Sequence, residues 1–191
     1  MNMLNVLLVE SDPDKSLLES SLKNCAYKIL KTHYSPLFLS LVKDITPDVI
    51  IFNLDTPSET ILADLHSLNQ QTPLPVVMFA NDSHIDTINR VIKADVSAYI
   101  TDGAADERIE SILNVAVARF KRLQMLKNAL EDARTQLEDR KQIDRAKAIL
   151  IKTQNFTEND AYHTLRKLAM DRNITLGEMA KNVIAMAELL K

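Results

Sequence analysis

Five short apolar runs in the first hundred residues constrain the fold of this chain more than any other feature of its sequence. The strongest three span residues 4–9, 49–52 and 76–79, and weaker runs at 27–30 and 98–100 complete the set. Short apolar runs with little polar interruption are typical of strands buried in a parallel sheet. Segments with apolar residues at helical spacing lie between them. The alternation predicts a doubly wound α/β fold with a five-stranded parallel sheet. Two of the helical segments carry Leu17, Leu18 and Leu22, and Ile85, Ile88, Val91 and Ile92.

The residues directly after these runs lie at the strand ends where ligands bind in such a fold. They are Glu10, Ser11, Asp12, Asn53, Ala80 and Asp102.

The order and spacing of the runs resemble the response-regulator receiver family over about residues 3–120. Three segments carry the resemblance jointly: Val-Leu-Leu-Val-Glu-Ser-Asp-Pro at 6–13, Pro-Asp-Val-Ile-Ile-Phe-Asn-Leu at 47–54, and Pro-Val-Val-Met-Phe at 75–79. The resemblance implies a flavodoxin-like domain over residues 1–120, with a phosphoacceptor aspartate after the third strand and magnesium beside it.

The residues at those positions depart from the family's chemistry. Asn53 stands in the phosphoacceptor position, and its neutral amide cannot form an acyl phosphate. Ser11 replaces one of two adjacent acids, so Glu10 alone is kept for a metal that needs several oxygen ligands. Ala80 replaces the family's hydroxyl residue, and Asp102 replaces its phosphate-binding lysine. We therefore predict a pseudo-receiver that takes no phosphoryl group, metal or cofactor.

Two acids offer an alternative to that interpretation. Asp12 would have to move into the metal site, and Asp55 would have to act as a substitute acceptor two residues beyond Asn53. A shift of two residues along a strand displaces a side chain by about 6 to 7 Å, which misaligns it with the other site groups. A further alternative is that Glu10, Asp12 and Asp102 are simply exposed acids at loop ends.

A long helix is predicted after the sheet, because no proline or glycine occurs between residue 106 and Gly177 and the stretch to Lys152 is rich in helix-forming residues. Residues 121–136 form the predicted connection. Apolar residues there alternate at spacings of three and four, which is the pattern of a coiled-coil seam and predicts a homodimer. Packing of the same seam against the chain's own domains is the alternative. The seam comprises Leu123, Leu126, Leu130, Ala133 and Leu137.

Residues 137–191 predict a small three-helix bundle. Thr157 with Asp160, and Thr175 with Glu178, have the spacing of capping boxes that start two further helices. Each helix has one apolar stripe, and three such stripes can bury one another. The stripes are Ile143, Ala146, Ile149 and Leu150; Ala161, Leu165, Leu168 and Ala169; and Leu176, Met179, Ala180, Val183, Ile184, Ala187 and Leu190.

This C-terminal segment resembles the ANTAR family of RNA-binding antitermination domains. The resemblance rests on residues 139–147 (Asp-Arg-Lys-Gln-Ile-Asp-Arg-Ala-Lys), 160–162 (Asp-Ala-Tyr) and 165–171 (Leu-Arg-Lys-Leu-Ala-Met-Asp). Together with the receiver-like half and residues 97–103 (Ser-Ala-Tyr-Ile-Thr-Asp-Gly), it is similar to nitrate-assimilation antiterminators of the NasT type. The resemblance implies binding to paired hairpins in a leader RNA, which prevents formation of a terminator, and regulation by a sensor protein that sequesters the chain.

Basic residues in this segment are the candidate RNA contacts. Residues 137–191 carry ten Lys and Arg against eight Asp and Glu, whereas the whole chain has a net charge of -3. At 100° per residue, Lys141, Arg145 and Lys152 lie opposite the apolar stripe. Cations bind phosphates, and an aromatic ring such as Tyr162 or His163 can stack on an unpaired base. A solvated basic face is the alternative. The predicted set is Arg140, Lys141, Arg145, Lys147, Lys152, Tyr162, Arg166 and Lys167.

Other functions are less well supported by the sequence. A DNA-binding regulator or a protein adaptor is the alternative, although no helix-turn-helix signature is evident. An enzyme is not expected, since two glycines rule out a glycine-rich phosphate loop and no nucleophile, base and orienting group occur together. No apolar run reaches the roughly 18 to 20 residues of a membrane span. With a single cysteine and no signal-type N-terminus, we expect a cytoplasmic protein.

Overall fold

The computed structural model describes residues 4–11, 18–19, 22, 27–101 and 108–189. The chain divides into two compact units, Met1–Gln124 and Met125–Lys191, and each is described by itself. The predicted domain limits at residues 120 and 137 remain predictions.

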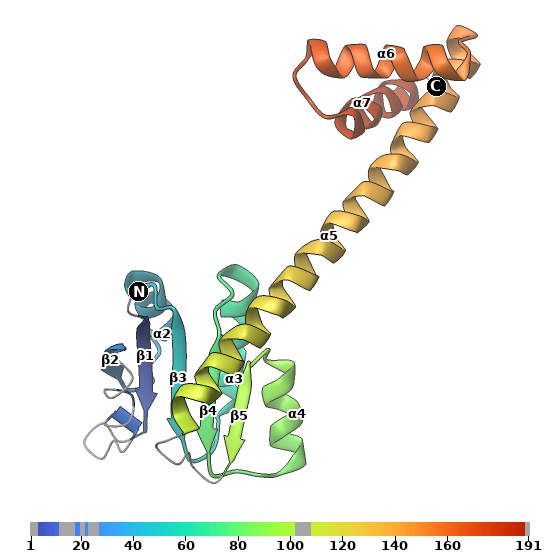
Figure 1. Ribbon diagram of the computed structural model, residues 1–191. Helices are drawn as coiled ribbons and strands as arrows, with labels where there is room; N and C mark the ends of the chain where they lie inside the picture. Colours follow the sequence, from blue (N-terminus) through green and yellow to red (C-terminus); the bar gives the residue numbers. More distant parts are fainter. Residues whose placement is uncertain (1–3, 12–17, 20–21, 23–26, 102–107, 190–191) are drawn as a thin grey trace. The chain divides into compact units, whose positions relative to one another are not determined.

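The first unit is built on a parallel sheet of five strands in the order β2-β1-β3-β4-β5 (Figure 1). This is the predicted fold class, and the strand order is that of flavodoxin-like sheets. The strands are β1 (Asn5–Glu10), β2 (Lys28–Thr32), β3 (Val49–Leu54), β4 (Val76–Ala80) and β5 (Ala98–Thr101).

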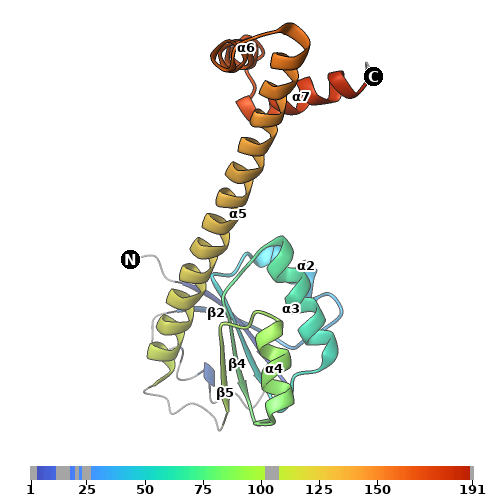
Figure 2. The same ribbon diagram turned by 90° about the vertical axis from the view of Figure 1, so that its right-hand side faces the viewer.

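Helices cover both faces of this sheet, which explains why its strands read as continuous apolar runs. Figure 2 shows α2 (Phe38–Ile45), α3 (Glu59–Gln71) and α4 (Ile85–Lys93) on one side, and the first turns of α5 (Ile109–Gln154) on the other. Successive side chains of a strand point to opposite faces. Thus Leu7 and Val9 join a core with α2, α3 and α4, whereas Val6 and Leu8 pack with the start of α5.

Helix α4 forms where it was predicted, but its buried face differs from the predicted apolar stripe. Val91 and Thr87 are buried, whereas Ile85 and Ile92 are 68% and 61% exposed. At 100° per residue, Thr87 and Val91 lie within 40° of each other, and Ile85 and Ile92 lie on the far side of the helix. The face of α4 that carries Thr87 and Val91 therefore packs in the interior, and Ile85 and Ile92 lie at the surface.

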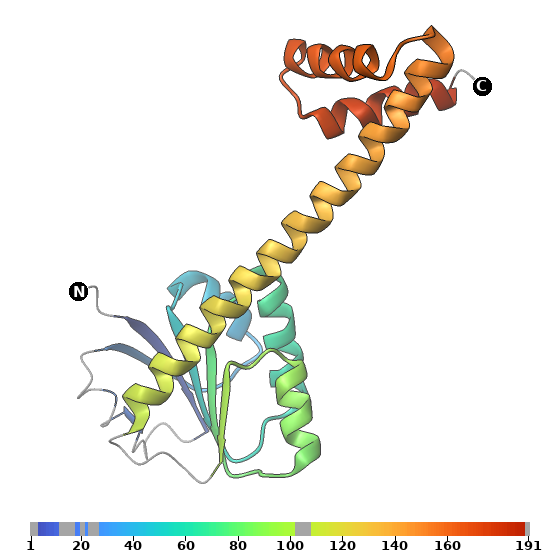
Figure 3. The same ribbon diagram turned by 45° about the vertical axis from the view of Figure 1, so that its right-hand side comes forward.

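The second unit is the predicted three-helix bundle, formed by the last part of α5 with α6 (Glu158–Asp171) and α7 (Leu176–Leu189) (Figure 3). The predicted capping boxes are present: Thr157 with Asp160 at α6, and Thr175 with Glu178 at α7. Asn155 and Asn173 follow α5 and α6 with φ of 57° and 52°, a left-handed conformation that asparagine tolerates at helix ends. The buried core comprises Ala146, Leu165, Ala169, Met179, Ala180 and Ile184.

A close approach between two helices fixes one glycine in the bundle. Gly177, in the first turn of α7, is buried against the carboxylate of Asp139 on α5. A Cβ at position 177 would overlap that carboxylate, so a residue with a side chain cannot stand there unless Asp139 moves. The Lys181 ammonium lies 3.8 Å from the Asp139 carboxylate on the same helix face.

Among the described helices, none combines the length and the apolar character that crossing a bilayer requires.

Candidate functional site

The end of β1 and the end of β3 meet at the receiver-like site. Glu10 and Asn53 are paired in the register of these two parallel strands. The Asn53 Nδ2 donates a hydrogen bond of 3.0 Å to Glu10 Oε1. Glu10 is only 2% exposed, so its carboxylate depends on protein groups in place of water.

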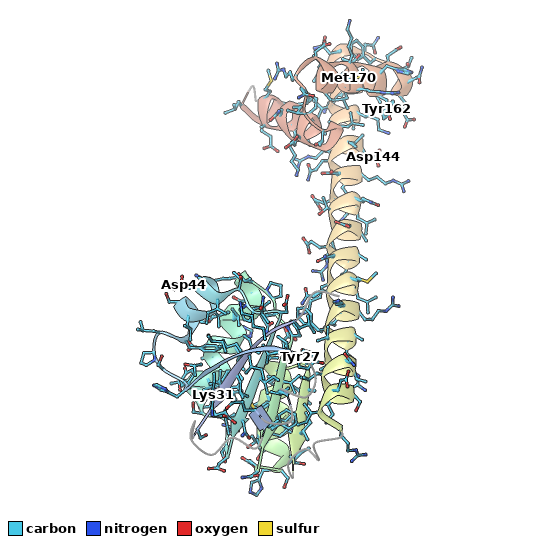
Figure 4. The ribbon with its side chains drawn as sticks, turned by 60° about the vertical axis from the view of Figure 1, so that its left-hand side comes forward. Tyr27, Lys31, Asp44, Asp144, Tyr162 and Met170 are labelled. Atoms are coloured by element: carbon cyan, nitrogen blue, oxygen red, sulfur yellow. The ribbon has the colours of Figure 1, made fainter. Side chains whose placement is uncertain are left out.

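A lysine that the sequence did not single out completes this site. Lys31 lies on β2 (Figure 4). Its Nζ lies 3.3 Å from Glu10 Oε2 and 3.1 Å from Glu19 Oε2. Burial opposes the charge of Lys31, but hydrogen bonding to Glu19 and Glu10 outweighs it and raises the pKa of the ammonium. No motif points to Lys31, because its contact depends on the side-by-side pairing of β1 and β2.

These residues do not fit the magnesium ion that the receiver resemblance implies. Magnesium requires several oxygen ligands, and Asn53 turns its N–H toward Glu10. Ser11 is exposed, and Ala80 offers only a buried methyl group. Among the described residues, no three acidic, histidine or cysteine side chains gather as a metal site. Asp12 and Asp102 lie outside the described residues.

The substitute acceptor considered above makes a different contact. Asp55 lies just after β3 and accepts a hydrogen bond of 2.8 Å from Asn81 Nδ2, while its backbone carbonyl accepts from the Asn81 N–H. This pairing joins the loops that follow β3 and β4.

A second polar network lies beside β5. Asp82 accepts hydrogen bonds from the His84 backbone N–H at 2.9 Å and from the Thr87 hydroxyl at 2.8 Å, and these lower the pKa of its carboxyl. The Tyr99 hydroxyl donates to the Asp82 carbonyl oxygen at 2.6 Å. Thr87 is buried because it serves this network, which explains the face that α4 turns to the sheet.

Two of the predicted RNA contacts form ion pairs with acids of the bundle. The Lys147 Nζ lies 2.8 Å from Asp144 and 3.0 Å from Glu158, and its side chain is only 17% exposed. Its hydrogen bond to Asp144, followed by that to Glu158, raises the pKa of the ammonium. Arg145 forms an ion pair of 2.6 Å with Glu188 of α7, with both side chains largely exposed.

The other predicted cations face solvent. Within the described part of the chain, they take part in no ion pair, and all five are exposed: Arg140, Lys141, Lys152, Arg166 and Lys167.

The outer face of α6 combines aromatic, basic and apolar side chains. Tyr162 is 38% exposed and meets His163 edge-on, with ring centroids 6.0 Å apart. Arg166 and Lys167 come one turn later along α6. Met170 follows them, and Figure 4 labels it together with Tyr162. At 100° per residue, His163, Lys167 and Met170 lie opposite the buried Ala161, Leu165 and Ala169 stripe, Arg166 lies to its side, and Tyr162 borders it. We call this set, from Tyr162 to Met170, the α6 outer face.

The predicted seam of α5 is exposed as well. Its four leucines range from 44% exposed at Leu123 to 61% at Leu137, and Ala133 between them is also exposed. Among the described residues, nothing from the chain itself buries this stripe.

Known proteins resemble each half of this chain, the receiver-like unit and the C-terminal bundle. Residues 131–184 match the ANTAR domain. The chain is 26% identical over 138 residues to the "Transcriptional regulatory protein PdtaR" of Mycobacterium tuberculosis, a match that covers 72% of this chain and 67% of the relative. It is 37% identical over 67 residues to a "Nitrate regulatory protein" of Klebsiella oxytoca, covering 35% of this chain and 17% of that protein.

A solved structure supports the fold of the first half. The signal receiver domain of a modulated diguanylate cyclase from Desulfovibrio desulfuricans G20 superposes with a TM-score of 0.55 at 16% identity. The superposition covers 63% of this chain and 98% of that domain.

The chain therefore joins a unit with the fold of a receiver domain to a C-terminal segment that matches the ANTAR domain, as predicted from its sequence. It is related in sequence to the mycobacterial transcriptional regulator and, in its ANTAR part, to the nitrate regulator.

Proposed function

We propose that this chain is an RNA-binding transcription antiterminator. It binds paired hairpins in a leader RNA and so prevents formation of a terminator. The observation that carries the proposal is the set of exposed cations on α5 and α6, within the segment that matches the ANTAR domain, that form no ion pair with any described residue. The likeness to a nitrate regulatory protein supports nitrogen or nitrate assimilation as the controlled process.

Phosphate contacts fall to the exposed cations in this proposal. A cation already held by two carboxylates loses those contacts when it binds a phosphate, whereas an unpaired one does not. We therefore assign phosphate binding to Arg140, Lys141, Lys152, Arg166 and Lys167, and bundle support to Lys147 and Arg145. On the α6 outer face, Tyr162 is placed to stack on an unpaired loop base.

Control of the activity passes through assembly or a partner, because Asn53 cannot carry a phosphoryl group. The exposed seam of α5 supports a homodimer, since a homodimer would present two ANTAR domains to two hairpins. A sensor protein that sequesters the chain is the expected regulator. We propose a cytoplasmic regulator without catalytic activity.

The RNA-binding test is a titration of the full chain with labelled RNA. Leader RNA with two hairpins is compared with the same RNA lacking one hairpin and with duplex DNA, at several salt concentrations. We expect tightest binding to the twin hairpins, and affinity that falls as salt rises because phosphate contacts release counterions. Preference for duplex DNA would instead indicate a DNA-binding regulator, and no binding to either would indicate a protein adaptor.

The dimer is tested separately by light scattering. Leu126→Lys with Leu130→Lys puts charges into the seam and should give a monomer. Met125→Lys is the matched control, because Met125 is also exposed but lies about 100° or more from the seam leucines. A dimer that persists in the double variant would contradict the seam, and a monomeric wild type would contradict the dimer itself.

A further inference from the structure

Glu10 is a buried acid whose negative charge must be compensated by other groups of the receiver-like site. Its side chain is buried, and a buried carboxylate is strongly unfavourable unless a positive charge or several hydrogen bonds compensate for it. In a receiver, a magnesium ion beside the acids would supply that charge. Here the residues around Glu10 do not fit such an ion.

The position of Lys31 answers this problem. It stands beside Leu8 in the register of β1 and β2, two residues before Glu10 along β1. From there its ammonium reaches Glu10 at 3.3 Å and the second carboxylate, Glu19, at 3.1 Å. The third group of the site, Asn53, donates its N–H to the other oxygen of Glu10. An ammonium and an amide thus approach opposite oxygens of one buried carboxylate.

We infer that Lys31 is a built-in cation that takes the place of a divalent metal at this site and closes the site to such metals. Ser11 and Asn53 stand where a receiver has acids, so the site carries less negative charge, and a monovalent ammonium is sufficient. A metal ion could reach Glu10 only by displacing Lys31, against the repulsion of two like charges. This inference does not depend on the proposed RNA-binding function.

A consequence is that restoring the phosphoacceptor alone does not restore a working receiver site. Asn53→Asp returns one carboxylate, but Lys31 then pairs with it as well. Only removal of the lysine opens the site.

Thermal unfolding of the full chain with and without magnesium tests the inference. We expect the wild type to be indifferent to magnesium. Lys31→Met should lower the midpoint of unfolding, because the buried Glu10 carboxylate loses its counter-charge, and magnesium should restore part of the loss only when Asn53→Asp also supplies an oxygen ligand. Lys28→Met is the matched control: it lies on the same strand, its side chain is exposed, and it should change neither the midpoint nor the response to magnesium.

Direct titration with manganese gives a second readout. Asn53→Asp with Lys31→Met should bind manganese at least about tenfold more tightly than Asn53→Asp alone, a difference of about 1.4 kcal/mol. Equal affinity of these two variants would overturn the inference, as would a wild type that magnesium stabilises or a Lys31→Met midpoint equal to that of Lys28→Met. If Lys31→Met does not fold, Glu10→Gln in the same chain should restore folding by removing the buried charge, and failure to do so would also overturn it.

Discussion

The two units of the chain use their cations in opposite ways. In the receiver-like unit, Lys31 lies between two carboxylates and compensates for a buried charge. In the bundle, Lys141, Lys152 and Arg166 face solvent and, within the described residues, have no acidic partner. The difference shows that the placement of basic residues, more than their number, indicates which half of this weakly acidic chain is open to an anionic ligand.

The hydrophobic cores of the two units differ in size. Two layers of buried side chains lie on the two faces of the sheet, whereas the bundle has one small core. A bundle of this size is close to the limit of independent stability. The candidate RNA contacts therefore stand on the less robust half of the molecule.

The largest expected effect comes from a cavity in the smaller core. Leu165 is fully buried between α6 and its neighbours, and Leu165→Ala should cost about 3 kcal/mol of unfolding free energy. We expect weakened RNA binding and faster hydrogen exchange in α6. Leu65→Ala makes a similar cavity in the sheet unit, where Leu65 is equally buried, and should leave RNA affinity unchanged. Equal loss of RNA binding in both variants would contradict the assignment of RNA binding to the bundle.

A smaller effect is expected at the α5–α7 contact. Gly177→Ala adds a methyl group against the Asp139 carboxylate and should cost about 2 kcal/mol, as overpacked sites do. Chemical denaturation followed by circular dichroism measures the change. Asp139→Ala in the same chain should recover much of the loss, because it removes the atoms that the new methyl group meets. Additive losses in the double variant would mean that contact with the Asp139 carboxylate does not set the effect, since alanine by itself favours a helix over glycine.

Single cations should change RNA affinity by less. Arg166→Ala removes an exposed charge and should weaken binding by about 1 kcal/mol, and reduce the salt dependence by about one unit of slope. Lys93→Ala, an exposed cation on α4 of the sheet unit, is the control and should have no effect. If Lys93→Ala weakened RNA binding as much as Arg166→Ala, the bundle would not be the RNA-binding half.

The smallest expected effect is a pH dependence in each unit. The Thr175 backbone N–H and hydroxyl lower the pKa of Glu178, and the His84 N–H and Thr87 hydroxyl lower that of Asp82. A lowered pKa in the folded state means that the stabilisation is present above the unfolded pKa, near 4, and is lost as pH falls through the folded value. Glu178→Gln should flatten this loss in the bundle alone, and Asp82→Asn in the sheet unit alone, as followed by residue-resolved hydrogen exchange.

Much of the fold follows from local sequence, because strand runs, helix stripes and capping boxes are short-range patterns. The positions of Glu10 and Asn53 at the ends of their apolar runs follow in the same way, whereas the pairing of β1 with β3 comes from the structure. The face of α4 was not, because its burial is decided by the hydrogen bond from Thr87 to Asp82.

The candidate site shows where local patterns fail. Lys31 directly follows the weak apolar run at 27–30, and only the pairing of β2 with β1 reveals its contact with Glu10. Lys147 lies in the predicted basic set, yet α6 brings Glu158 back against it after the turn at Asn155. Both contacts join elements whose mutual placement no periodicity specifies.

Asp139, against which Gly177 packs, follows Leu137 by two residues, and Leu137 is the last leucine of the α5 seam. Leu137, Asp139 and Lys181 line one shallow hollow on the surface. A rotation of α5 about its own axis that re-aimed Leu137 would carry Asp139 with it and disturb the start of α7. A partner that binds the α5 seam is therefore coupled to the packing of α7, because Leu137 and Asp139 lie within a single turn of α5.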